Sequence, residues 1–311
     1  MSILRKIMQK SWKTVEKADA ERSEKQHRVQ GVSYEKDIPY LSDGNPLHQL
    51  NMYYPEKLKW NRENRLPIII DIHGGGLMYG DKELNRNYCE YLASKGFAVM
   101  GMSYRLLPET DLQGIVQDVF ASVHWLEHFG EDRCLDLNRI YLTGDSAGGH
   151  LASLVMCIQN SKKLQDIYQV TPFSFEFAGT AICNGVCEMH DYYNYEKKIN
   201  EKIDKEIVSM ICGKTGAKAP WAAYMNFSQC LEEVDKAKLP KLMIIGSESD
   251  SFYRQTEWIL ENLEKHQLPS HNLIWKKEDG VHLGHVFQVS HWEWKESLKT
   301  NDQMIEFFNC K

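Results

Sequence analysis

The sequence predicts an α/β fold, with a mostly parallel central sheet and helices on both faces. Short and almost purely apolar runs alternate along the chain with longer segments in which apolar residues recur every three or four positions. Runs of the first kind are typical of strands buried on both faces, and segments of the second kind are typical of helices that cover a sheet. With 42% hydrophobic residues, the 311-residue chain has enough apolar material for a large core.

The predicted strands lie where apolar residues run together. Leu66–Ile72 (LPIIIDI) is the clearest, and its Pro67 stands near the strand start, where a missing N–H is tolerated. The other predicted strands are Phe97–Tyr104, Arg139–Thr143, Ala178–Ile182, Leu242–Ile245 and Asn272–Lys276. Because connections between parallel strands are right-handed, the carboxyl ends of these strands meet at one edge, where open α/β sheets bind their ligands.

Helices are predicted between the strands. In Asp111–His128, apolar residues such as Leu112, Ile115 and Val119 recur at spacings of three and four, which places them on one face of a helix. The other predicted helices are Leu151–Ile158, Phe252–His266 and Trp292–Phe308. Each of them follows a predicted strand, as a layered α/β fold requires.

Two segments do not fit this alternation. Met1–Gln30 carries one apolar face, which includes Ile7 and Trp12, surrounded by lysines and arginines. Such a helix either lies on a membrane surface or packs over the edge where the strands end, and we favour packing because a short amphipathic helix usually docks on its own protein. Asn184–Leu239 is too long for a plain loop, and it predicts a lid or a structure of its own.

Composition argues against several classes of protein. The formal net charge is -6, so nucleic acid is not an expected partner, because phosphate binding needs a basic surface. No apolar run approaches the roughly 18–20 residues that cross a bilayer, and no secretory h-region is present, so we expect no stable membrane insertion. The eight cysteines show no framework spacing. They predict reduced thiols and therefore a cytoplasmic location.

The strongest local signal is the segment Gly144–Gly149 (GDSAGG). It follows the predicted strand Arg139–Thr143 and precedes a predicted helix, which is the strand–turn–helix context of a nucleophile elbow. The turn would hold Ser146 in a strained conformation with its hydroxyl at a helix N-terminus, where developing negative charge is favoured. The alternative is an ordinary glycine-rich turn. A phosphate loop is disfavoured because no lysine follows the glycines at Walker spacing.

A second glycine cluster, His73–Gly76 (HGGG), follows the predicted strand Leu66–Ile72. Consecutive glycines allow several backbone N–H groups to turn toward one point, as an oxyanion hole requires. We predict that Gly75, Gly76 and Ala147 supply these N–H groups, and that His73 anchors the loop. The alternative is a flexible loop, but each motif stands at a strand end, which favours a shared site.

These two motifs, with Tyr104–Glu109 (YRLLPE) between them, resemble the hormone-sensitive-lipase-like esterases of the α/β-hydrolase superfamily. That family carries the HGGG, Y-R-L-x-P-E and G-D-S-A-G-G motifs in this order. The resemblance implies an α/β-hydrolase fold, with a mostly parallel central sheet of about eight strands, helices on both faces and a small helical cap. It also implies structural polar contacts for Arg105 and Glu109.

The resemblance further implies a division of the chain. We expect an N-terminal helical cap segment at 1–30 and an α/β-hydrolase catalytic domain at 31–311. A cap insertion is expected at about 185–238, which includes Tyr192, Tyr193 and Tyr195. A cap of this kind over a bounded pocket favours small esters over long triglycerides.

An acid and a base follow the nucleophile along the chain in α/β-hydrolases. Asp250, after the predicted strand Leu242–Ile245, is the predicted acid, and Glu248 is the alternative. The loop after the last predicted strand offers two histidines. The family usually has His-Gly-Phe here, and His285 fits the His-x-Phe spacing, so we predict His285 as the base over His282. The role of the base would be to take the serine proton and return it to the leaving alcohol.

The pair His282-x-x-His285 has a second interpretation as metal ligands. No nearby cysteine or third histidine completes a zinc pattern, so we expect neither a metal nor another cofactor. Cys183 and Cys187 are likewise interpreted as packed thiols.

Leu77, Met78 and Tyr79 follow the glycine cluster and are predicted to line the substrate pocket. The leading hypothesis is a serine carboxylesterase that hydrolyses short-chain, acetyl-type esters of small molecules through a Ser-His-Asp triad and an acyl-enzyme. A sugar-ester (acetyl or feruloyl) esterase or an amidase on the same triad is an alternative. A non-catalytic ligand-binding homologue is another. The sequence is compatible with a homodimer.

Overall fold

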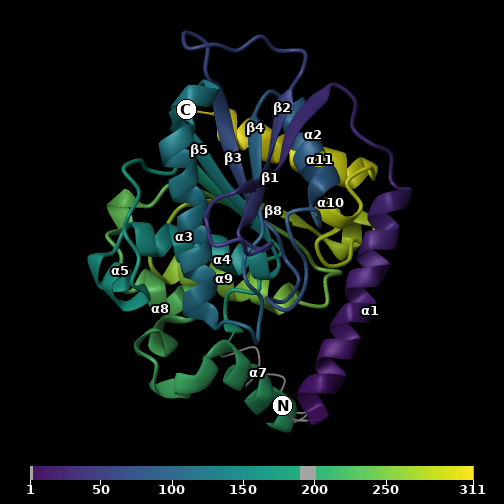
Figure 1. Ribbon diagram of the computed structural model, residues 1–311. Helices are drawn as coiled ribbons and strands as arrows, with labels where there is room; N and C mark the ends of the chain where they lie inside the picture. Colours follow the sequence, from purple (N-terminus) through teal and green to yellow (C-terminus); the bar gives the residue numbers. More distant parts are fainter. Residues whose placement is uncertain (1–2, 190–200, 311) are drawn as a thin grey trace.

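The computed structural model describes residues 3–189 and 201–310, and its centre is an eight-stranded sheet (Figure 1). The strand order is β1-β2-β4-β3-β5-β6-β7-β8, in which β1 and β2 run antiparallel to their neighbours and the other six are parallel. The predicted mostly parallel α/β sheet is therefore confirmed. The strands are β1 (Val32–Pro39), β2 (Gln49–Pro55), β3 (Leu66–Ile72), β4 (Ala98–Met102), β5 (Leu135–Asp145), β6 (Gly179–Cys183), β7 (Lys241–Ser247) and β8 (Ser270–Trp275).

Helices cover both faces of the sheet, and each face has its own apolar core. One face packs against α3 (Leu112–Phe129), α4 (Ala147–Gln159) and α9 (Tyr253–Lys265). The other packs against α2 (Arg86–Ser94) and α11 (Lys295–Asn309). α4 is buried along almost its whole length, which explains why its sequence is apolar on every side.

Shorter helices complete the part of the chain that the structure describes. They are α5 (Lys162–Tyr168), α7 (Glu201–Ile211), α8 (Phe227–Leu231) and α10 (Phe287–Ser290), with 3₁₀ turns at 131–133, 213–218, 220–224, 236–238 and 277–279. α7 and α8 belong to the predicted insertion at 185–238. Tyr192, Tyr193 and Tyr195 of that insertion lie outside the described residues.

The N-terminal helix α1 (Ile3–Lys25) lies along one side of the molecule, with its first turns near α7 (Figure 1). The Trp12 indole stacks on the Tyr79 ring at 5.4 Å, and the Tyr79 hydroxyl donates to Asp19 over 2.7 Å. Farther along, Gln26 donates to the carbonyl of Ser290 over 2.8 Å. The helix is therefore packed on its own protein. No described helix combines the length and apolar character needed to cross a bilayer.

The two motifs and the predicted acid and base all follow strands that end at the same edge of the sheet. β3, β5, β6, β7 and β8 are parallel neighbours, so their carboxyl ends share one edge of the sheet. The glycine cluster follows β3, the Gly144–Gly149 motif spans the end of β5, and Asp250 and His285 follow β7 and β8. The eight cysteines all lie within the described residues and are free thiols.

Candidate active site

The turn between β5 and α4 has the strained geometry of a nucleophile elbow. Ser146 adopts φ +53° and ψ -116°, in the region that L-residues rarely occupy. A Cβ at Gly144 would lie 2.3 Å from the carbonyl oxygen of Gly148, and a Cβ at Gly148 would lie 1.9 Å from that of Ile72. Both positions therefore require glycine for steric reasons, and they allow Ser146 to project at the N-terminus of α4.

A chain of hydrogen bonds joins the three predicted triad residues. The Oγ atom of Ser146 lies 2.8 Å from Nε2 of His285. On the other side of the ring, Nδ1 lies 2.9 and 3.0 Å from the two carboxylate oxygens of Asp250. The carboxylate fixes the ring so that Nε2 is free to accept the serine proton, which is the arrangement of a charge-stabilised general base.

Asp250 is held by two further donors. Asn184, directly after β6, donates to Oδ2 over 2.8 Å, and the backbone N–H of Phe252 donates to Oδ1 over 2.8 Å. The Asp250 side chain is almost fully buried, so these bonds offset part of the cost of burying its charge. The sequence analysis did not identify Asn184 as a site residue, although its position directly after a strand could have indicated it.

The two alternative residues lie elsewhere. Glu248 accepts the backbone N–H of Lys277 over 3.0 Å, and His282 is exposed. His285, rather than being free for a metal, is already bonded to Ser146 and Asp250. Within 3–189 and 201–310, no cluster of three or more His, Cys, Asp or Glu side chains has metal-site geometry.

The loop after β3 brings the predicted oxyanion residues beside the serine. Gly75 and Gly76 have φ of +98° and +61°, and a Cβ at Gly75 would lie 2.1 Å from the carbonyl oxygen of Tyr79. Both glycines, with Ala147 at the first turn of α4, line the same cavity as Ser146. The three residues predicted to supply N–H groups therefore lie in the same cavity as Ser146.

Buried side chains anchor this loop from behind. The Tyr104 hydroxyl donates to the carbonyl of His73 over 2.8 Å, and its ring stacks on that of His73 at 4.3 Å. Asp145 accepts the backbone N–H of Gly74 over 3.0 Å. Burial lowers the pKa of His73 to about 4, so His73 is a neutral anchor at neutral pH. Tyr104 and Asp145 belong to the recognised motifs, but the sequence analysis assigned them no role.

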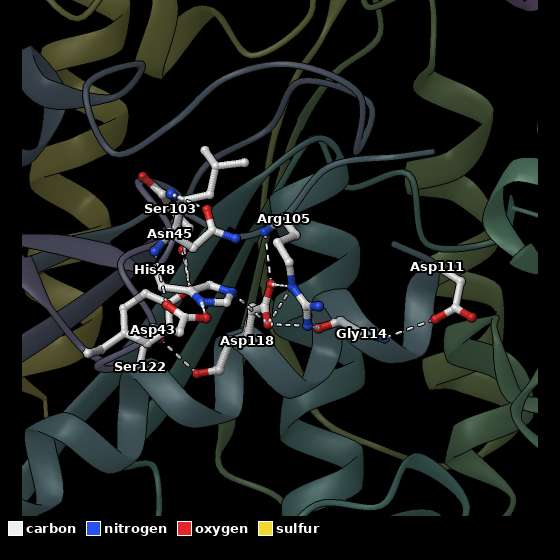
Figure 2. A network of polar contacts seen from close by, with 12 residues as sticks. Asp43, Asn45, His48, Ser103, Arg105, Asp111, Gly114, Asp118 and Ser122 are labelled. Carbon is white, nitrogen blue, oxygen red and sulfur yellow. Dashed lines mark hydrogen bonds and ion pairs between the residues drawn. The ribbon is translucent and has the colours of Figure 1, made fainter. Parts of the chain in front are cut away.

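A polar network supports the neighbouring segment that follows β4 (Figure 2). Arg105 makes bidentate contacts with Asp118 of α3, and Asp118 also lies 3.3 Å from His48. The Asp118 hydrogen bond is the main cause of the raised pKa of Arg105. In the same segment, the N–H of Leu107 donates to the carbonyl of Leu77 over 2.8 Å. The network that holds this segment therefore also fixes the outer end of the glycine loop.

The cavity around Ser146 has a volume of about 540 Å³. Its apolar lining includes Trp12, Met78, Tyr79, Val186, Met189 and Ile207. Met78 and Tyr79 therefore lie where they were predicted. Leu77 does not line the cavity: it is 1% exposed and packs in the core, because its φ of +63° turns it away from the neighbouring side chains. The contribution of Trp12 was not predicted.

This geometry agrees with what the comparisons with known proteins find. The family model described as BD-FAE matches residues 50–263, which is more than half of the chain. The chain belongs to the BD-FAE family. This BD-FAE member is a carboxylic ester hydrolase of the α/β-hydrolase fold, and the resemblance to hormone-sensitive-lipase-like esterases is confirmed.

Several relatives of this BD-FAE esterase are similar over different lengths. Inhibited Esterase B from Lactobacillus rhamnosis is 40% identical, with a TM-score of 0.92 over 99% of this chain and 96% of that one. Probable carboxylesterase 3 from Arabidopsis thaliana is 23% identical over 88% of this chain and 85% of its own length. Esterase LipI from Mycobacterium tuberculosis is 32% identical over 29% of this chain, and the chain spans only 28% of LipI.

Proposed function

We propose that the protein is a serine carboxylesterase that hydrolyses short-chain acyl esters of small alcohols. Ser146 is the nucleophile, His285 the general base and Asp250 the residue that orients the imidazole. The observation that carries the proposal is the continuous hydrogen-bond chain, 2.8 Å from Ser146 to His285 and 2.9 Å from His285 to Asp250. Hydrogen-bond contact between nucleophile, base and orienting acid is the geometric signature of this chemistry.

The reaction follows from these roles. His285 takes the proton of Ser146 as Oγ attacks the ester carbonyl, and the tetrahedral oxyanion accepts hydrogen bonds from the N–H groups of Gly75, Gly76 and Ala147. The C–O bond to the alcohol then breaks while His285 returns the proton to the leaving oxygen. Water, deprotonated by His285, attacks the acyl-enzyme, and the acid leaves as Ser146 regains its proton.

Two observations support a short acyl chain. The cavity has a volume of about 540 Å³, and its apolar lining includes Trp12. The related Esterase B from Lactobacillus rhamnosis is known in a form inhibited by a tributyrin phosphonate, an analogue of a four-carbon acyl ester. Both support the short-chain preference predicted from the sequence, and they favour acyl chains of a few carbons as well as acetyl.

The decisive experiment is a chain-length series of p-nitrophenyl esters combined with covalent labelling. We expect the highest kcat/KM for short chains, stoichiometric loss of activity with an alkyl fluorophosphonate, and a mass increase on the peptide that contains Ser146. Stoichiometric labelling would exclude the non-catalytic alternative. Parallel assays with acetylated sugars, feruloyl esters and anilides test the sugar-ester and amidase alternatives. If one of these alternatives holds, its substrate should have a higher kcat/KM than the p-nitrophenyl esters.

Replacing Trp12 by alanine is expected to shift the preference toward longer acyl chains. A second cavity of about 710 Å³ shares Trp12, Met78 and Tyr79 with the first one, so the indole forms part of the wall between them. Removing the indole opens space for further methylene groups of the acyl chain. In an apolar pocket, each methylene group contributes about 1–3 kcal/mol to the discrimination between substrates. The kcat/KM ratio of p-nitrophenyl octanoate to butyrate should rise about tenfold.

A matched control for this variant is Trp60→Ala. Trp60 stacks on Tyr54 at 5.6 Å and lines neither cavity. This variant removes an indole of the same size and should leave the chain-length ratio unchanged. An unchanged ratio in Trp12→Ala, with both variants folded, would show that Trp12 does not limit chain length.

A further inference from the structure

Two carboxylates that the proposed reaction does not use are buried behind the glycine loop. Asp71 lies on β3 and Asp145 ends the neighbouring strand β5, and they are 2% and 5% exposed. The side-chain amide of Asn85 bridges them: Nδ2 lies 2.7 Å from Oδ1 of Asp145 and 3.0 Å from Oδ2 of Asp71. Two buried like charges at one amide are costly unless one of them is neutralised by a proton.

The contacts of the two groups are unequal. Asp145 accepts two N–H bonds, from Asn85 and from the backbone of Gly74 over 3.0 Å, and both favour its charged form. Asp71 has Asn85 and the thiol of Cys89 at 3.5 Å, and its Oδ1 atom has no partner in 3–189 and 201–310. Burial, and then the negative charge of Asp145, raise the pKa of Asp71 to about 8. The proton of the pair therefore belongs on Asp71 at neutral pH.

The surroundings supply no positive charge to Asp71. Five titratable groups interact electrostatically with Asp71, so that the charge of one affects the pKa of the other. They are Asp145 on β5, Cys89 and Tyr88 on α2, Cys183 on β6 and Tyr104 after β4. Burial raises the pKa values of these thiols and phenols, so they are neutral near pH 8. Burial also raises the pKa of Asp145, but the Asn85 hydrogen bond, the nearby His285 and the Gly74 N–H act in the opposite direction and favour its charged form, so Asp145 is the one charged neighbour among these groups.

Asp145 connects this pair to the oxyanion loop. It holds Gly74, the residue before Gly75 and Gly76, and a Cβ at Gly74 would lie only 2.5 Å from Oδ2 of Asp145. The loop is thus in direct van der Waals contact with the carboxylate. Any displacement of Asp145 is transmitted to the N–H groups that face the reacting carbonyl, where errors of a fraction of an ångström lower the rate.

We propose that Asp71 is a positioning residue: its protonated form keeps Asn85 and Asp145 in place behind the oxyanion loop, and its ionisation at alkaline pH displaces them and slows ester hydrolysis. The inference rests on the proposed roles of Ser146 and of the loop glycines. An ionised Asp71 competes with Asp145 for the amide of Asn85 and repels it across a medium of low dielectric constant.

The same proton affects stability, with a defined sign. Between about pH 4 and pH 8 the folded protein holds a proton on Asp71 that the unfolded chain has released. The free energy of unfolding therefore falls as the pH rises through this window. An asparagine at position 71 removes this dependence, so the wild type should lose more of its Tm than Asp71→Asn between pH 5 and pH 8.

The test is the pH profile of kcat for p-nitrophenyl butyrate in the wild type and in Asp71→Asn. We expect the wild-type kcat to fall with an apparent pKa near 8. The neutral, isosteric variant should lose this alkaline limb or show it at least about one pH unit higher. Coincident alkaline limbs in the two proteins would overturn the proposal. A control variant, Asp136→Asn, changes a carboxylate at the opposite end of β5 and should retain the wild-type limb.

A second measurement does not depend on turnover. In the Ser146→Ala background, infrared difference spectra should show a protonated carboxyl band that disappears with the same apparent pKa near 8, and Asp71→Asn should remove it. A missing band would overturn the proposal even if kcat had an alkaline limb. Should Asp71→Asn fail to fold, Asp71→Ser serves in both experiments. Failure of the proposed triad would appear separately, as activity that survives in Ser146→Ala.

Discussion

Replacing Ser146 by alanine should lower kcat for p-nitrophenyl acetate by about four to six orders of magnitude. The variant removes the one atom that lies both 2.8 Å from His285 and in the cavity lined by Gly75 and Gly76. Without a nucleophile, only the oxyanion hole and binding contribute, and they leave a small residual rate over water. The measurement is kcat under saturating substrate, with residual wild-type contamination excluded by fluorophosphonate titration.

The neighbouring serine of α4 provides a matched control. Ser153 is buried, and its hydroxyl donates to the carbonyl of His150 over 2.7 Å, away from His285. Ser153→Ala therefore makes the same chemical change on the same helix and should keep kcat within a few-fold of the wild type. A Ser146→Ala protein that hydrolyses the ester at the wild-type rate would refute the assignment of the nucleophile.

The sequence was most informative about strands that are buried on both faces. β3, β6 and β7 appear in it as short apolar runs, because parallel strands under two helical layers have no solvent-facing side. β1 was missed because it lies at the sheet edge and reads VSYEKDIP, a largely exposed and polar run. β2 and α2 were missed because their apolar residues are interrupted by buried polar ones, such as Asn51 in β2 and Asn87 and Glu90 in α2.

The site was predictable where short-range sterics fix the geometry. The glycines around Ser146 are adjacent in the chain, so the motif alone indicates the strained turn. Asp250 and His285 follow predicted strands, and parallel topology brings their loops to the same edge. By contrast, Leu77 and Met78 are adjacent, and only the backbone angle at Leu77 decides which of them faces the cavity.

Contacts between distant segments could not be derived from any local pattern. Asn85, directly before α2, contacts both Asp71 on β3 and Asp145 on β5. It can do so because β3 and β5 are neighbours in the sheet. Trp12 meets Tyr79 only because α1 docks beside the glycine loop. Asn85 and Asp145 are 60 residues apart in the chain, and so are Tyr79 and the α1 residue Asp19 to which it donates, so these contacts depend on the tertiary arrangement. They set the shape of the oxyanion loop and of the substrate cavity, so the finer determinants of activity lie beyond the motifs.

Replacing Gly148 by alanine should damage the fold itself. The added Cβ would lie 1.9 Å from the carbonyl oxygen of Ile72 and 2.6 Å from that of His73. Both obstacles are backbone atoms, so no side-chain rotation relieves the overlap, and α4 or the end of β3 must move. We expect a loss of about 3 kcal/mol or more in the free energy of unfolding, and a Tm lower by roughly 6–12 °C. Thermal unfolding followed by circular dichroism provides the measurement.

Gly284→Ala is the opposing control for this prediction. A Cβ at Gly284 meets no atom within 4 Å, and the residue has no positive φ, so alanine fits there without strain. Because alanine reduces the conformational freedom of the unfolded chain, this variant should match or slightly exceed the wild-type Tm, by up to about 1 kcal/mol in stability. Equal Tm values for Gly148→Ala and the wild type would mean that α4 does not press on the end of β3. The steric explanation of the serine turn would then fail.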